Sequence, residues 1–189
     1  MASHSAKDSE RMTDAAKTVA RSRCVMTEIV LPNDTNGLGN LMGGRLLHLM
    51  DKAAAISAQR HANRVCVTAS VDTVEFESAI RQGEIIVLES QVNRVFRTSM
   101  EVEINVWAED PHKETRRKCN RAFFTFVAVD ENTKPVPIAP IIPETDEEKE
   151  RYESATKRRE LRLLMSGRLQ LSDAEGLKED VMEIIRRDE

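Results

Sequence analysis

The sequence predicts an α+β domain in which a curled antiparallel sheet wraps one long central helix. Residues 41–62 carry apolar side chains at helical spacing, whereas several other segments alternate apolar and polar residues as strands do. One helix and one sheet have to bury each other's apolar faces, so we expect the sheet to curl around the helix. With 189 residues, of which 40% are hydrophobic, the chain is long enough for one such domain with tails rather than for two.

The predicted helix follows a loop rich in asparagine and glycine at 33–40. Its first half is apolar over most of its circumference, which favours a helix covered by other elements on nearly all sides. Residues 53–58 read Ala-Ala-Ala-Ile-Ser-Ala, so another backbone can approach the helix closely there.

A first strand is predicted at 21–31, before the helix, because this segment is rich in β-branched residues. After the helix, four segments have strand character: 65–76, 84–96, 99–109 and 118–130. Gly83 supplies the positive φ of a turn, and the polar stretch 108–115 predicts a hairpin loop. The order indicates a four-stranded antiparallel meander.

The sequence divides into a flexible N-terminal arm at 1–20, the α+β domain at 21–143 and a charged helical extension at 144–189. Four prolines between 135 and 143 predict an extended linker at the end of the domain.

In the extension, Thr145 and Glu148 have the spacing of a capping box, and Ser172 and Glu175 repeat it before a last short helix. We interpret these helices as a solvated appendage or a brace between subunits.

Charge and composition exclude several functions. A net charge of -4 and a pI near 5.7 disfavour nucleic acid as the main partner. The sequence has no run of 18 apolar residues, so no membrane span is predicted. The first residues also lack the apolar core of a signal peptide. Three scattered cysteines favour reduced thiols and a cytoplasmic location, with Cys66 buried. No Cys/His spacing indicates a metal, and no glycine-rich nucleotide loop is present.

The start of the helix is the best candidate for chemistry. Gly43 and Gly44 let a ligand approach backbone N–H groups that the first turn leaves unpaired. Asp51 lies about two turns further on, where a carboxylate is costly to bury without a function. Two structural alternatives remain for Asp51, an ion pair with Arg45 and one with Lys52.

Four ordered motifs resemble the hotdog-fold acyl-CoA thioesterases of the acyl-CoA hydrolase family. They are Asn40-Leu-Met-Gly-Gly-Arg-Leu-Leu-His-Leu-Met-Asp51, Val67-Thr-Ala-Ser-Val-Asp72 with Phe76 and the Gly83 turn, Arg97-Thr-Ser-Met-Glu-Val102, and Phe124-Thr-Phe-Val-Ala-Val-Asp130 with Pro137. The similarity covers about residues 24–143.

The resemblance implies cleavage of acyl-CoA to a carboxylic acid and free CoA, with CoA as part of the substrate and no separate cofactor. It implies Asp51 as the catalytic carboxylate and Asn40 as the family's asparagine. The family's strand motifs imply residues that line the path of acyl-CoA, and the two glycines at the start of the helix belong to the same set. The set is Gly43, Gly44, Thr68, Ser70, Arg97, Thr98 and Ser99. For the CoA phosphates, other arginines remain alternatives to Arg97: Arg64, Arg94, Arg116, Arg117 and Arg121.

The family dimerises edge to edge, and the resemblance implies a hexamer of three dimers. The spacing of Asn40 and Asp51 independently indicates a second subunit. Asn40 and Asp51 are eleven positions apart, which is about 16 Å along one helix, so both cannot contact one thioester within one chain. We therefore expect sites composed of residues from two subunits.

Two positions depart from the family's motifs. Phe96 stands where many relatives have glycine, and Met42 replaces a commoner phenylalanine before the glycine pair. Both bear on the preferred acyl length rather than on the reaction. Two other functions remain as alternatives. One is a non-catalytic acyl-CoA-binding regulator, and the other is an enoyl-thioester hydratase that uses His48 with Asp51.

Overall fold

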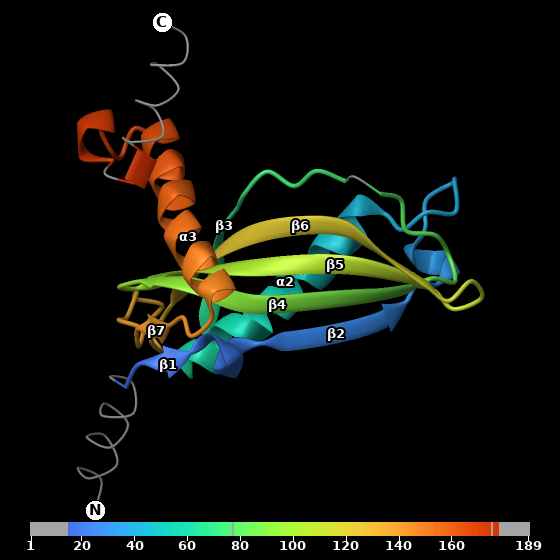
Figure 1. The fold of residues 1–189 in the computed structure, drawn as a ribbon, viewed down its shortest axis with the longest axis horizontal. Coiled ribbons are helices and arrows are strands. Elements are labelled where there is room, and N and C mark those ends of the chain that lie inside the picture. The colour runs from blue at the N-terminus through green and yellow to red at the C-terminus, as the bar shows by residue number, and fades with distance from the viewer. Residues whose placement is uncertain (1–14, 77, 175, 178–189) are drawn as a thin grey trace, which may run out of the picture. The chain divides into compact units, whose positions relative to one another are not determined.

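A computed structural model describes residues 15–76, 78–174 and 176–177 (Figure 1). They form two compact units, one ending at Ile142 and the other beginning at Pro143. The first unit contains β1 (Lys17–Thr18), the 3₁₀ helix η1 (Val19–Ser22), β2 (Cys24–Ile29), the 3₁₀ helix η2 (Pro32–Asp34), α2 (Gly43–Ala62), β3 (Cys66–Val71), β4 (Ile85–Phe96), β5 (Ser99–Asp110), β6 (Thr115–Ala128) and β7 (Ile141–Ile142). The second contains α3 (Asp146–Met165) and the 3₁₀ helix η3 (Leu171–Asp173).

The main sheet has five antiparallel strands in the order β2-β4-β5-β6-β3. The predicted meander of four strands is correct for β4, β5 and β6 and wrong for β3. Strand β2 occupies the side of β4 that faces away from β5. Strand β3 pairs instead with β6, at the opposite edge of the sheet. The described residues between 72 and 84 contain no regular strand, and this connection carries the chain from the edge strand β3 across the sheet to β4, which lies next to β2 (Figure 1).

Helix α2 lies across this sheet and shares its core, which confirms the α+β prediction (Figure 1). The helix buries Leu49, Met50, Ala53 and Ala54, and the sheet buries the central residues of β5, such as Val102. The small residues allow the close approach that the sequence predicted. On β4, the Ser90 hydroxyl donates to the Ala53 carbonyl at 2.8 Å and lies 2.7 Å from the Ser57 hydroxyl.

The described residues leave one face of α2 uncovered, contrary to the prediction of a helix wrapped on nearly all sides. Gly44, His48, Lys52 and Ile56 recur every four residues and are all exposed, which leaves a stripe along the helix open. We call these four residues the open stripe of α2. In the described part of the chain, no helix is long and apolar enough to cross a membrane.

The chain also forms a two-stranded parallel sheet, β1 with β7, that the sequence did not predict. Lys17 and Val19 belong to the predicted flexible arm but are buried, and Ile138 and Ile141 belong to the predicted linker but are buried as well. Both segments pack at the end of α2, where the Lys17 ammonium donates to the His61 carbonyl. Residues 1–14 of the predicted arm lie outside the described residues.

The His61 side chain is buried at this junction. Its Nε2 lies 2.9 Å from the Ala139 carbonyl, which requires a proton on Nε2, and its Nδ1 has no hydrogen-bond partner among the described residues. Burial, opposed in part by that hydrogen bond, lowers the pKa of His61 below its ordinary value, and the nearby Lys17 charge lowers it further. The imidazole is therefore neutral in the folded chain.

We expect the free energy of unfolding to fall as the pH drops below about 6.5. The unfolded His61 takes up a proton there and the folded one does not, so this stability is complete above pH 6.5 and is lost on acidification. Chemical denaturation at pH 7.5 and 5.5 measures the effect. His61→Gln keeps a donor for Ala139 without titrating and should flatten the dependence. His112→Gln, in the exposed β5–β6 turn, should leave it unchanged. If the free energy of unfolding changed equally with pH in the native chain and in both variants, the pH dependence would not come from His61.

The three cysteines are free, as the scattered spacing indicated, and all three are buried, as was predicted for Cys66. Burial raises the pKa of the Cys66 thiol to about 11, so this side chain is a protonated apolar group rather than a nucleophile.

In the second unit, the predicted capping box is confirmed. The Thr145 hydroxyl accepts from the Glu148 N–H at 3.2 Å, and the Glu148 carboxylate accepts from the Thr145 N–H at 3.3 Å. Glu175 and most of the predicted last helix lie outside the described residues.

Candidate active site

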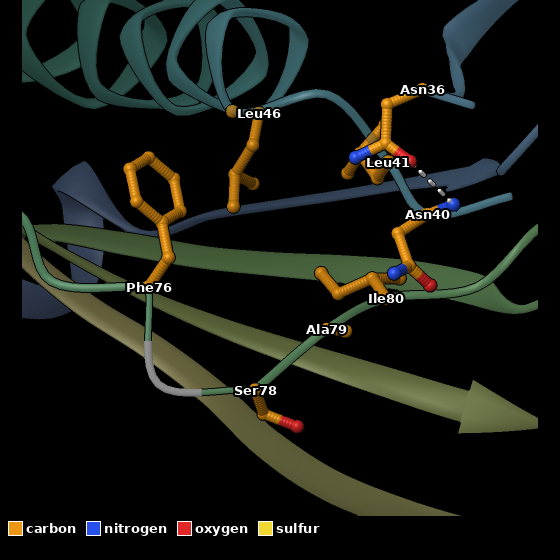
Figure 2. Close-up of a pocket in the computed structure, with 9 residues that line it drawn as sticks. Asn36, Asn40, Leu41, Leu46, Phe76, Ser78, Ala79 and Ile80 are labelled. Atoms are coloured by element: carbon orange, nitrogen blue, oxygen red, sulfur yellow. Dashed lines mark hydrogen bonds between the residues drawn. The ribbon is translucent and has the colours of Figure 1, made fainter. Parts of the chain in front are cut away.

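The loop before α2 is closed around the side chain of Asn36. Its Oδ1 accepts from the backbone N–H groups of Leu38 at 2.9 Å and Asn40 at 3.2 Å (Figure 2). Backbone bonds between Asn36 and Asn40 and from Leu41 to Ile80 fix the loop to the segment that precedes β4. Since its oxygen is occupied, the Asn36 carboxamide is held with its NH₂ group as the remaining donor.

Asn40 lies in the same loop, three residues before the helix begins at Gly43. It forms an isolated bridge with Arg81, and its side chain lines a pocket together with Asn36 (Figure 2). The sequence analysis did not select Asn36. Its position two residues before Leu38 and four before Asn40, in an Asn-Gly turn, was the available signal.

The start of α2 has no side-chain cap, because the N-cap residue Met42 has an apolar side chain. The two glycines behave differently. A Cβ added to Gly43 would lie 3.2 Å from the Phe76 ring, whereas one added to Gly44 would meet no atom within 4 Å. The backbone at Gly44 is therefore open to an approaching group, whereas the Phe76 ring lies on the side of Gly43 where a Cβ would project.

Asp51 is half-buried on α2, and its Oδ1 accepts a hydrogen bond from the Thr68 hydroxyl at 2.6 Å. The two ion pairs proposed as alternatives are not formed. Arg45 lies 3.1 Å and Lys52 3.7 Å from the Glu28 carboxylate instead. Among the described residues, the polar contact of Asp51 is thus a neutral hydroxyl and not a cation.

His48, the candidate dyad partner, is exposed on the open stripe, and no hydrogen bond joins it to Asp51 in the described structure. Within one chain, an Asp/His pair of the hydratase type is therefore not assembled.

The other predicted binding residues lie on two strands and one hairpin. Ser70 follows Thr68 across a β-bulge of β3. Arg97 and Thr98 form the β4–β5 turn, where Arg97 has a φ of 48°, and the Ser99 hydroxyl lies 3.4 Å from the Phe96 carbonyl. Ser99 is in register with Val127 of β6, so β6 separates this hairpin from β3 by about 10 Å. The structure brings Thr68 to Asp51 but not Thr98 or Ser99.

Three of the alternative arginines stabilise the sheet. Arg117 donates to both Glu84 oxygens at 2.8 and 2.7 Å, and these hydrogen bonds lower the pKa of Glu84. Arg121 pairs with Glu103 at 2.7 Å, and Arg116 pairs with acidic residues of β4 and β5. Arg97 is exposed on its turn and has no ion pair among the described residues. Among all described residues, no group of three His, Cys, Asp or Glu side chains is placed to hold a metal ion.

A long helix packed on a five-stranded antiparallel sheet, with a carboxylate on the helix, defines the α+β class of the chain, and comparison with known proteins identifies the family. Residues 38–115 match the family model of the thioesterase superfamily. A Bacillus subtilis (strain 168) protein, named as an uncharacterized acyl-CoA thioester hydrolase, YkhA, is 43% identical over 137 residues, covering 72% of this chain and 80% of that one. Mouse acyl-coenzyme A thioesterase 11 is 42% identical over 74% of this chain, which spans only 23% of the mouse protein.

Solved structures with a similar fold carry the same kind of name. A hexameric acyl-CoA thioesterase has a TM-score of 0.78 at 42% identity, covering 80% of this chain and 97% of that one. A Staphylococcus aureus acyl-CoA hydrolase in complex with butyryl-CoA, CoA and CoA disulfide has a TM-score of 0.74 at 34% identity, covering 80% and 94%. Variants of that enzyme replace an aspartate, an asparagine and a threonine by alanine. The chain belongs to the thioesterase superfamily, within its hotdog-fold acyl-CoA hydrolase family, and the predicted fold and family are confirmed.

Proposed function

We propose that the chain hydrolyses acyl-CoA thioesters to a carboxylic acid and free CoA. The observation that carries this proposal is a half-buried carboxylate, Asp51, held by Thr68 and not neutralised by Arg45 or Lys52. Such a carboxylate is suited to accept a proton or to attack a carbonyl. The relatives named as acyl-CoA thioester hydrolases support the same substrate class.

In the proposed reaction, N–H groups at Gly43 and Gly44 and the positive end of α2 polarise the thioester carbonyl. Asp51 takes a proton from a water that attacks the carbonyl, or attacks it directly to give an anhydride that water then cleaves. In either case the C–S bond breaks and CoA leaves as a thiolate. The leaving thiol has a pKa near 8.5, roughly that of a free cysteine, so little acid assistance is needed.

Thr68 acts as a positioning residue. Because its hydroxyl donates to Oδ1 of Asp51, the rotation of the carboxylate is restrained and Oδ2 remains for the water or the thioester. The threonine, aspartate and asparagine replaced in the Staphylococcus aureus enzyme follow the same order and spacing in its numbering as Thr68, Asp51 and Asn36 do here, which supports these roles.

For the asparagine, we propose Asn36 ahead of the sequence candidate Asn40. Both side chains line one pocket, but the carboxamide of Asn36 is oriented by two backbone donors. A fixed NH₂ group can bind the carbonyl oxygen without losing freedom at the moment of reaction. Asn40 remains the second candidate for this role.

The site requires two copies of the chain. Gly44 and Asp51 of one helix are about 10 Å apart along its axis, too far to serve one carbonyl. Strand β3 lies at a sheet edge, with exposed valines at 67 and 71, and Thr68 connects it to Asp51. We propose a dimer through the β3 edges, in which the open stripe of α2 faces the partner.

Three such dimers would form the predicted hexamer, and hexameric thioesterases among the relatives support this assembly. We place the protein in the cytoplasm, as a rat relative named a cytosolic acyl coenzyme A thioester hydrolase suggests. No cofactor beyond the CoA of the substrate is proposed.

The CoA moiety is proposed to run from Ser70 toward the β4–β5 turn. There Thr98 and Ser99 supply hydroxyls, and Arg97 supplies an exposed guanidinium for a phosphate.

The test of the reaction is release of free thiol from a panel of CoA esters, from acetyl to palmitoyl, by the purified full chain. Saturable thiol release is the expected result. Tight binding of the esters without any thiol release would instead establish the non-catalytic regulator, and consumption of an enoyl ester without thiol release would establish the hydratase.

A further inference from the structure

A pocket of about 290 Å³ lies beside the start of α2 (Figure 2). It is formed by the loop before the helix, the first turn of the helix, Phe76 and residues 78–80. Its lining residues are Asn36, Asn40, Leu41, Gly43, Leu46, Phe76, Ser78, Ala79 and Ile80. None of these residues carries a charge, and the two asparagines lie together at one side of the pocket (Figure 2).

The wall of the pocket at Phe76 depends on the glycine at position 43. The Phe76 side chain is 54% exposed, and its ring atoms lie 3.2–3.6 Å from the place that a Cβ of residue 43 would occupy. Figure 2 shows Phe76 and Leu46 pointing into the same space, one from the segment after β3 and one from α2. An exposed aromatic ring that rests on a glycine has few neighbours to hold it and can be removed at little cost to the core.

We propose that this pocket receives the acyl chain of the substrate and that Phe76 sets the longest chain that it accepts. This inference rests on the proposed function and deepens it by naming a specificity-determining residue. An uncharged, largely apolar pocket fits an alkyl chain and does not fit the phosphates of CoA. Its asparagines place the donor for the carbonyl oxygen at one side, so the chain extends from there toward Phe76.

The wall at Phe76, rather than the volume of the pocket, sets the length, because the pocket is partly open to solvent. Met42 and Phe96, which the sequence suggested as determinants of chain length, are not among the lining residues. Phe96 instead lies under the Arg94 guanidinium, 5.6 Å from it, at the end of β4.

The test compares kcat/KM for butanoyl-, octanoyl-, dodecanoyl- and palmitoyl-CoA. For the native chain, we expect kcat/KM to decline toward the longer esters of this panel. Phe76→Ala should raise the ratio of dodecanoyl to butanoyl about 10-fold or more, because an opened wall admits further methylene groups. Ala79→Leu fills the pocket and should shift the preference toward shorter chains. Phe96→Ala is the matched control and should keep the native profile.

The outcomes separate the two proposals. No thiol release from any ester by the native chain would remove the proposed function itself. Activity with the same chain-length profile in Phe76→Ala and Ala79→Leu would overturn the pocket assignment alone. An equal rise in KM for every ester in Phe76→Ala would also overturn it, because the pocket would then hold the pantetheine arm that all esters share. Ala79→Leu changes an exposed position and keeps the test valid if Phe76→Ala does not fold.

Discussion

Replacing Asp51 with asparagine is expected to lower the turnover number by on the order of 10²-fold or more, because the substitution removes the proposed base or nucleophile. The asparagine Oδ1 still accepts a hydrogen bond from Thr68, so the local structure is preserved. Thiol release at saturating acyl-CoA measures the effect, and the KM reports whether binding survives.

Glu28→Gln is the matched control for Asp51→Asn. It also removes a partly exposed carboxylate near α2, together with the contacts to Arg45 and Lys52. We expect its turnover to stay within a few-fold of native. If Asp51→Asn kept more than a tenth of native turnover, the carboxylate would not be the reactive group.

The second large effect is expected at the loop asparagines. Asn36→Ala removes the oriented donor and should reduce kcat by roughly 10²–10³-fold, as loss of one oxyanion donor does. Asn40→Ala removes a side chain from the same pocket but keeps the backbone N–H that binds Asn36, so its effect should be smaller. The reverse order of effects would restore Asn40 to the role that the sequence suggested.

Mixed subunits extend this comparison. If each site takes Asn36 from one copy and Asp51 from the other, dimers of Asn36→Ala with Asp51→Asn chains contain one intact site. Unfolding and refolding the two inactive variants together should then recover a measurable fraction of activity. Mixed dimers, verified by mass, without any recovery would place both residues in a site within one chain.

Local patterns predicted most of the fold correctly because they depend on neighbouring residues. The helical spacing from Leu46 onward and the Thr145–Glu148 capping box were both recognisable in this way. Strand order was not, since the place of β3 next to β6 depends on which sheet edge β2 leaves open. The same limit hid the β1–β7 pair, whose partners lie more than a hundred positions apart.

The candidate site shows the same difference between local patterns, which the sequence predicts, and long-range contacts, which it does not. Asp51 and the glycine pair stand out because a carboxylate and a flexible backbone are unusual in an apolar helix. Thr68 was selected only as part of the acyl-CoA path, and its bond to Asp51 depends on a sheet edge reaching the helix. Asn36 was missed because the glycine pair drew attention to Asn40. The side chain that we propose for this role, Asn36, is fixed by a turn four residues earlier.

The position of β3 at the edge of the sheet has a consequence for how the enzyme behaves on dilution. A solitary copy exposes one side of that strand, with its amide and carbonyl groups and its valines, to any other extended chain. In the proposed dimer, pairing of the two β3 edges would protect the molecule from aggregation by the same contact that completes the site. When the protein is diluted below the dissociation constant of that dimer, specific activity should therefore fall.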